Sequence, residues 1–197
     1  MRGQAHTLEA FGAAVILVVS LLFAMQVTAV TPLSASTSSQ HIENQQQAIA
    51  EDVLRTADEE GELEAAVLYW NEENGTFHGL EDEENDHYAP EAFSDRTAVG
   101  ERLHEAFTDR GIAYNLHVNH GDNESRTQQR IVYSGEPSDH AVSATRLLTL
   151  YVDDSLYDGS ETETDIDLNE SDEFYVENAQ EESFYGVVEV EVIVWRM

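Results

Sequence analysis

The hydrophobic pattern of the chain begins with one continuous apolar run, at residues 10–30. Its sequence is AFGAAVILVVSLLFAMQVTAV, and only Ser20, Gln26 and Thr28 interrupt it with polar side chains. A helix rises 1.5 Å per residue, so about 20 apolar residues cross the ~30 Å hydrocarbon core of a bilayer. The run therefore predicts a transmembrane helix, which follows a short leader at residues 1–9.

A linker and a stalk helix are expected at residues 31–61. Thr31-Pro32 predicts a kink or an interruption, because proline lacks a backbone donor and restricts the residue before it. The small polar sequence SASTSS follows and is typical of a linker. A second helix is predicted from an N-cap at Ser38 or Ser39 to a stop at Gly61. Its narrow apolar stripe consists of Ile42, Ile49, Val53, Leu54 and Ala57.

The remaining residues, 62–197, change to a pattern that is typical of strands. A buried strand is predicted at 65–70, and a weak helix is predicted in APEAF at residues 89–93. A clearer helix is expected from Thr97 to Arg110, because Val99, Leu103, Ala106 and Phe107 lie on one of its faces. Gly111 supplies its C-cap.

Alternating residues predict the strands of a sheet in this C-terminal region. The segments 112–120 and 127–135 are expected to pair as a hairpin across the turn GDNES. Another strand is predicted at 140–152, and a hydrated acidic loop is expected from Asp153 to about Ser183. The last segment, FYGVVEVEVIVWRM, alternates most regularly and is therefore expected at the centre of the sheet.

The predicted fold class is α+β. An N-terminal transmembrane helix and a stalk helix precede a head with a mostly antiparallel, four- to five-stranded sheet and one packed helix. The expected organisation is a leader and cleavage region, a membrane helix, a linker with the stalk helix, and an extracytoplasmic head. Their residues are 1–9, 10–30, 31–61 and 62–197.

The charge of the chain adds information about its environment and its partners, because the chain has 40 acidic and 9 basic residues. All of the basic residues are arginine, and the formal net charge is −31. The strand-like apolar runs argue against a disordered acidic chain. Excess Asp and Glu without Lys resembles the proteins of halophiles that accumulate salt, most of which are archaea. The same charge argues against a nucleic-acid partner, since nucleic-acid binding needs a basic surface.

The flanks of the apolar run predict its orientation in the membrane. Arg2 precedes the run, and the residues beyond it are strongly acidic, so the N-terminus is expected in the cytoplasm and the head outside the cell. A secretory signal has a shorter apolar core of about 7–15 residues and a cleavage site of small residues. Only Thr28-Ala29-Val30 approaches such a site, so retention of the helix is favoured over its removal.

The junction Arg2-Gly3-Gln4-Ala5 resembles the class III signal peptides of archaeal type IV pilin-like proteins and archaellins. The resemblance covers about the first 30 residues. It implies that a prepilin peptidase cleaves between Gly3 and Gln4, so that the apolar helix stays in the mature protein. It also implies a role for Glu9, which stands near the start of the mature helix as a glutamate does in many such pilins.

Two interpretations of Glu9 stay open from the residues alone. In a bundle of such helices its carboxylate can pair with the free α-amino group of a neighbouring subunit. In a single-pass anchor it lies in the headgroup layer, near the positive end of the helix dipole. A cluster of small residues after it, which allows helices to approach closely, favours packing of the helix against others. The cluster consists of Ala10, Gly12, Ala13 and Ala14.

Candidate glycosylation sites occur in the predicted head at three Asn-x-Ser/Thr sequences, each within an expected turn or loop. Their asparagines are Asn74, Asn123 and Asn169.

No catalytic or metal site is predicted. The chain has no cysteine, which excludes thiol catalysis and zinc–thiolate sites. Asp165, Asp167 and Asn169 are spaced as in a calcium loop, but Glu170 stands where that loop needs glycine, which favours a solvated acidic loop. His117 and His120 fall on opposite faces of a strand and are interpreted as surface residues. No cofactor is expected, and Ser143 lies outside any G-x-S-x-G sequence.

The expected function is that of a pilin-like cell-surface subunit, minor or accessory, in an archaeal type IV pilus-like filament. Its expected partners are the membrane, other pilin-like subunits or further copies of itself, and a prepilin peptidase. The alternative is a single-pass anchored ectodomain that binds an envelope component or ligand without polymerising. A secreted enzyme is a more distant alternative.

Overall fold

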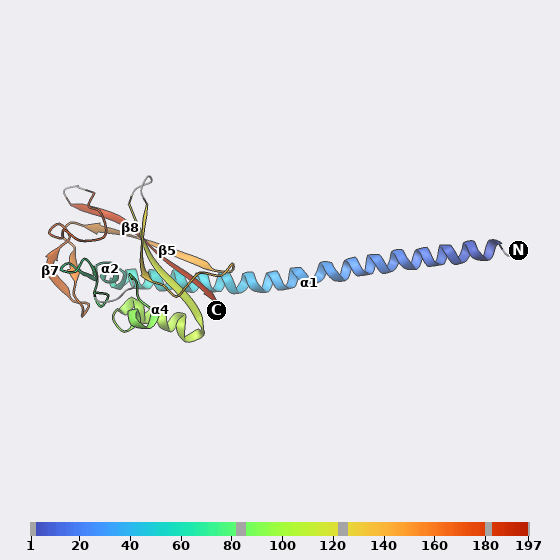
Figure 1. Ribbon diagram of the computed structural model, residues 1–197, viewed down its shortest axis with the longest axis horizontal. Coiled ribbons are helices and arrows are strands. Elements are labelled where there is room, and N and C mark those ends of the chain that lie inside the picture. Colours follow the sequence, from blue (N-terminus) through green and yellow to red (C-terminus); the bar gives the residue numbers. More distant parts are fainter. Residues whose placement is uncertain (1–2, 82–85, 122–125, 180–182, 197) are drawn as a thin grey trace. The chain divides into compact units, whose positions relative to one another are not determined.

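The computed structural model describes residues 3–81, 86–121, 126–179 and 183–196; at residues 3–8 and 26–39 it describes the backbone alone (Figure 1). It is an α+β structure with an antiparallel sheet and several helices, as predicted. The chain divides into two compact units, Met1–Ile42 and Glu43–Met197. The second unit contains all the strands and is called the head below.

Helix α1 covers Gly3–Glu59, so the first unit is helical throughout its described residues. The helix runs through Thr31-Pro32, and the predicted interruption at that point is wrong. A proline inside a helix removes one backbone hydrogen bond and clashes with the preceding turn. Good helix formers stand on both sides, namely Ala, Leu and Met within the apolar run 10–30 and Ala, Gln and Glu within the segment 40–59, and they extend the helix across this local cost.

The main sheet of the head has four antiparallel strands in the order β4-β3-β8-β5. The hairpin β3 (Ile112–His120) and β4 (Thr127–Val132) was predicted, as was β5 (Val142–Tyr151). Strand β8 (Phe184–Arg196) lies between β3 and β5, which confirms the central position expected from its regular alternation.

The strand register assigns each side chain to one of two faces of this sheet. Leu116 of β3 lies opposite Val192 of β8, which lies opposite Ala144 of β5, and all three are buried. This inner face continues along β8 through valines that are fully buried, as the alternation predicted. The outer face carries His117, opposite Glu191, and Leu147, opposite Glu189.

The C-terminal part of α1 belongs to the same hydrophobic core as the inner face of the sheet. Ala50, Leu54 and Ala57 are buried within that core. Two side-chain hydrogen bonds connect this part of the helix to β5 and to the loop before it. Glu43 accepts from His140 at 3.0 Å, and Asp58 accepts from Nε of Arg146 at 2.7 Å. The helix and the strand therefore run side by side in the same direction.

A short helix replaces the strand that was predicted at residues 65–70. The chain turns at Gly61 (φ 77°) into α2 (Glu62–Val67), and only then enters the hairpin of β1 (Trp70–Asn71) and β2 (Thr76–Phe77). The segment is buried on all sides, so its apolar pattern alone fits a helix as well as a strand. The sequence ELEAAV, which directly follows Gly61, consists mostly of good helix formers and therefore favours the helix.

The predicted helix after Thr97 is present as α4 (Ala98–Ala106), followed by the 3₁₀ turn η1 (Thr108–Arg110). Thr97 accepts a hydrogen bond from Gly100 N and so caps the helix. Helix α3 (Pro90–Ser94) packs closely against this first turn. A side chain at Gly100 would lie 2.5 Å from the carbonyl oxygen of Phe93, so only glycine permits this approach.

The predicted acidic loop after Asp153 contains a further hairpin, so the expectation of a loop throughout is wrong. Strand β6 (Ser155–Tyr157) pairs with β7 (Glu163–Asp167). Between them Glu161, at φ 54°, accepts from the N-terminal N–H of α4, Ala98 N, with both carboxylate oxygens (3.1 and 3.0 Å). The acidic residues are therefore partly structural, since a carboxylate at a helix N-terminus is favoured by the helix dipole.

Candidate functional site

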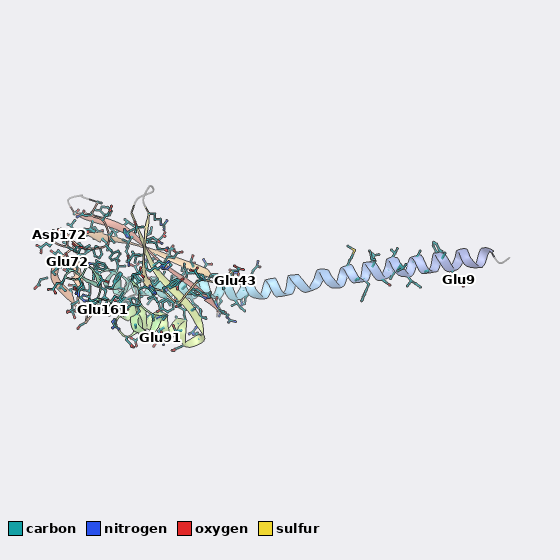
Figure 2. The ribbon with its side chains drawn as sticks, viewed as in Figure 1. Glu9, Glu43, Glu72, Glu91, Glu161 and Asp172 are labelled. Atoms are coloured by element: carbon teal, nitrogen blue, oxygen red, sulfur yellow. The ribbon has the colours of Figure 1, made fainter. Side chains whose placement is uncertain are left out.

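The apolar part of α1 carries the strongest candidate site, because its described side chains, those of residues 9–25, are all exposed. Figure 2 shows these side chains around the helix, with Glu9 labelled at its beginning. Phe11 is 70% exposed, Leu17 67% and Phe23 68%. Exposure of apolar surface costs about 25 cal/mol per Å², so a helix of this kind needs a lipid or a protein around it.

The predicted packing residues lie on this exposed segment. Ala10, Ala13 and Ala14 are exposed, and a side chain built at Gly12 would have no atom within 4 Å. Their small side chains leave the backbone open to close approach by another helix. Within the residues whose side chains are described, no helix meets the combined length and apolarity that crossing a membrane requires.

The predicted processing site lies at the start of the same helix. Gly3 is the first residue of α1, and Gln4 is the second. Their side chains lie outside the described residues, as do those up to Leu8. Gly3 and Gln4 therefore lie six and five positions before Glu9 on the same helix.

A groove in the head runs between α1 and α4. It has a cavity of about 360 Å³, and Ile49 and Val53 of α1 face Ala106 of α4 across it. Arg102 stands at its rim and donates to Glu60, just after α1, and to Glu62 at the start of α2. This ion-pair cluster connects α4 to the turn at Gly61, because the two glutamates flank that turn.

The two histidines of β3 are buried, so their interpretation as surface residues is wrong. His117 is 6% exposed and His120 is 7% exposed. Neither ring nitrogen of His117 has a hydrogen-bond partner within the described residues. Burial lowers the pKa of both rings; for His117, Glu191 raises the pKa and Arg130 lowers it further. Burial therefore disfavours the charged form of both rings.

A polar network surrounds His117 on the outer face of the sheet. Asn119 donates to Glu189 and to Glu191 at 3.3 Å each, and it accepts from Gln128 at 3.1 Å. Arg126 also pairs with Glu189. The sequence contained a signal for this network, namely the alternation of Asn115, His117 and Asn119 on one strand with Glu189 and Glu191 on another. The pairing of β3 with β8 was the missing information.

The candidate glycosylation sites lie partly within the described residues. Asn74 is exposed in the turn between β1 and β2, and Asn169 is exposed in the turn after β7. Asn123 lies outside the described residues. The hydroxyl of Ser171, the third residue of the Asn169 sequence, donates to Glu72.

The acidic region near Asn169 is organised by hydrogen bonds between its own residues. Glu72 accepts from the backbone of Asp172 at 2.8 Å, and the two residues lie close together in Figure 2. Asp167 accepts from the hydroxyl of Ser155 at 3.2 Å. In the described ranges, no three His, Asp or Glu side chains gather closely enough to hold a metal ion.

Comparisons with known proteins place the chain in a family but supply no activity. No solved structure and no curated protein matches the chain. One family model, described as a family of unknown function (DUF7288), matches residues 2–194. Because this match extends over nearly the whole sequence, the chain belongs to that family.

Proposed function

We propose that the chain is a pilin-like cell-surface subunit, minor or accessory, of a type IV pilus-like filament. Before assembly, the apolar part of α1 lies in the membrane and the head lies outside the cell. In the filament, the same part of α1 packs against the helices of other subunits. One observation carries the proposal. The same helix exposes apolar side chains at residues 9–25 and buries Ala50, Leu54 and Ala57 in the core of the head.

This division of α1 assigns two tasks to one helix. A helix that is apolar on all sides is stable in a membrane or in the interior of an assembly. The buried part contributes to the hydrophobic core of the head, and the apolar segment belongs to the same helix. An anchor and an assembly helix both need such an attachment, and the small residues of the Ala10–Ala14 segment favour assembly.

Glu9 has a specific role in this proposal. After cleavage behind Gly3, the mature chain begins with the α-amino group of Gln4. In the filament, the carboxylate of Glu9 pairs with that amino group on a neighbouring subunit. A carboxylate at the edge of an apolar bundle is costly without such a partner, so the pair sets the register between helices.

The charge of the head favours a minor or accessory role over a bulk structural one. Each copy has a formal net charge of −31. Long stacks of identical heads would bring these charges together, and like charges in contact oppose assembly even when salt shortens their range. A subunit that is present in few copies avoids most of this repulsion.

Mass spectrometry of the N-terminal peptide from native membranes tests the processing step. We expect the mature chain to begin at Gln4. Gly3→Val is expected to block cleavage and leave Met1, because the resemblance assigns the peptidase site to Gly3. Gly12→Val is the matched control, since it makes the same change within the helix, and it is expected to begin at Gln4. An intact Met1 in the unchanged protein would overturn the proposal.

Fractionation tests the assembly step separately. Filaments sheared from cells are expected to contain the protein at low abundance, with the remainder in the membrane. A chain that begins at Gln4 but is absent from sheared filaments would contradict filament incorporation. That result would support the alternative, an anchored ectodomain that binds an envelope component without polymerising.

A further inference from the structure

Strand β5 is an edge of the main sheet with a long open side. It pairs with β8 on one side only, over its whole length from Val142 to Tyr151 (Figure 1). On its other side, the described residues make no hydrogen bond to the backbone between Val142 and Leu150. Pairing resumes only beyond the strand, where the carbonyl of Val152 accepts from Asn169 N at 3.1 Å.

The opposite edge of the sheet is shorter and partly covered. Strand β4 ends at Val132, and the backbone of Tyr88 bridges its end. Tyr88 N donates to Ile131 at 2.8 Å, and Tyr133 N donates to Tyr88 at 3.1 Å. The two edges therefore differ, and β5 is the one that offers a continuous row of backbone donors and acceptors.

Strand β5 also carries few of the features by which proteins protect open edges. Such edges usually carry charges, proline or a bulge in mid-strand. Residues 142–151, VSATRLLTLY, include no acidic residue and no proline, although the chain has 40 acidic residues. The single charge, Arg146, points to the inner face, where it pairs with Asp58. The register shift in this strand lies at its end, between Leu150 and Tyr151.

The outer face of β5 is uncharged and exposed. Leu147 is 65% exposed and Tyr151 is 49% exposed. The polar residues of this face are Ser143, Thr145 and Thr149, all exposed. The nearest acids, Glu189 and Glu191 of β8, are already engaged with Asn119. An acid-free strip, formed by β5 itself, thus lies along the open edge of a strongly acidic molecule.

We infer that β5 pairs antiparallel with β5 of a second copy of this chain, so that the two sheets continue into each other. Two copies that each carry −31 repel one another over acidic surfaces, and this acid-free strip is a place where they can meet. Antiparallel pairing of identical strands has two-fold symmetry and closes on itself. The backbone groups of the open edge then find partners, as in β-strand addition.

Symmetry limits the register of this pair. In a continued antiparallel sheet, opposite residues lie on the same face, so the two-fold axis passes through a residue position. An axis at Leu147 places the two leucines opposite each other and Thr145 opposite Thr149 of the second copy. An axis at Arg146 would place two guanidinium groups opposite each other. Of the two axes at the middle of β5, which pair the most residues, the one at Leu147 is therefore the expected one.

Disulfide crosslinking of the full-length chain in mild detergent and molar salt tests this pair. The chain has no cysteine, so each introduced thiol is unique. Opposite Cα atoms in an antiparallel pair lie about 4.5–5.5 Å apart, within the range for a disulfide. Under copper–phenanthroline and air as oxidant, Leu147→Cys is expected to form a covalent dimer. Val187→Cys is the matched control, because it is also exposed on the outer face but lies one strand inward.

The register is tested with two further variants. Thr145→Cys and Thr149→Cys are each expected to stay monomeric alone and to crosslink when the two proteins are mixed. Leu147→Glu, which places two acids opposite each other, is expected to abolish crosslinking in that mixture. Thermal melts followed by circular dichroism confirm that each variant folds, since all the changed residues are exposed.

Equal crosslinking of Leu147→Cys and Val187→Cys would overturn the inference, as would the absence of crosslinking in folded protein. The inference does not rest on the proposed function. A chain that crosslinks through Leu147→Cys but retains Met1 would support the pair and refute the processing. A chain that begins at Gln4 and does not crosslink would support the processing and refute the pair.

Discussion

At the scale of single residues, His117 is the most unusual group in the head. It is buried, neither ring nitrogen has a hydrogen-bond partner within the described residues, and it lies between Arg130 and Glu191 on the outer face of the sheet. Burial lowers the pKa of His117, Glu191 opposes that effect, and Arg130 adds to it. A histidine in this environment stays neutral in the folded protein at pH values where it is charged in the unfolded chain.

Folding stability is therefore expected to depend on pH through His117. An unfolded histidine has a pKa of about 6.5, and the pKa in the folded protein is lower. Between the two values the unfolded chain binds more protons, so stability falls as pH falls below about 6.5. The free energy of unfolding, measured in denaturant and molar salt from pH 8 to 5, is expected to show this loss. His120 contributes in the same direction.

The substitution His117→Gln is expected to remove the contribution of His117 to the pH dependence of folding stability. Relative to this variant, the unchanged protein is expected to lose stability below about pH 6.5 and to keep a constant difference above pH 7.5. His41→Gln changes an exposed histidine and serves as the control. This variant is expected to show the same dependence of stability on pH as the unchanged protein. A difference between the unchanged protein and His117→Gln that is constant across the range would refute the assignment.

At the scale of elements, the sequence correctly predicted the helices and strands whose hydrophobic pattern fits only one type of secondary structure. The alternation of β8 and the stripe of α4 each fit a single secondary structure, and both predictions are confirmed. The segment 65–70 is apolar on all sides, and its form is set by the stop at Gly61, so the strand prediction failed. Burial of His117 and His120 depends on the pairing of β3 with its neighbours, which one strand does not reveal.

The exposed apolar part of α1 was predicted from composition, whereas the buried part was predicted only approximately. The predicted stripe included Ile49 and Val53, which are half-buried, and Leu54, which is buried. It omitted Ala50, which is fully buried. A small residue that faces a sheet is difficult to recognise from sequence, because alanine occurs on both the buried and the exposed faces of helices.

The two parts of α1 are expected to respond differently to the same substitution. Leu54 is 1% exposed, so Leu54→Ala leaves a cavity in the core and is expected to lower the free energy of unfolding of the head by about 2–5 kcal/mol. Leu22→Ala makes the same change at a residue that is 57% exposed, and it is expected to leave head stability unchanged. Denaturant unfolding of both full-length variants in detergent, followed by tryptophan fluorescence, makes the comparison.

Similar losses in the two variants would contradict the division of α1 into an exposed segment and a core segment. Trp70 and Trp195 both lie in the head and are buried, so the fluorescence change reports on the head.

At the scale of the whole molecule, repulsion between carboxylates is the dominant electrostatic effect. The arginine ion pairs among the described residues use Arg55, Arg102, Arg126 and Arg146, and two of these arginines, Arg55 and Arg102, bind two acids each. Against 40 acidic residues they neutralise only a small part of the charge. Burial adds to the cost locally, since it raises the pKa of Glu64 and of Glu161, and neighbouring acids raise both further.

The head is therefore expected to need molar salt to fold. At 0.1 M salt the Debye length is about 10 Å, so acids on neighbouring elements repel one another, whereas at 1 M it is about 3 Å. Circular dichroism melts are expected to show a cooperative transition in 2–3 M KCl that weakens and disappears on dialysis into dilute buffer. Concentrated sucrose, which favours compact states without screening charge, is the control and is expected to restore the fold only partly. The same melting transition in dilute buffer and in molar salt would show that the acidic surface does not limit folding, because ion pairs such as Arg146–Asp58 would then outweigh the repulsion.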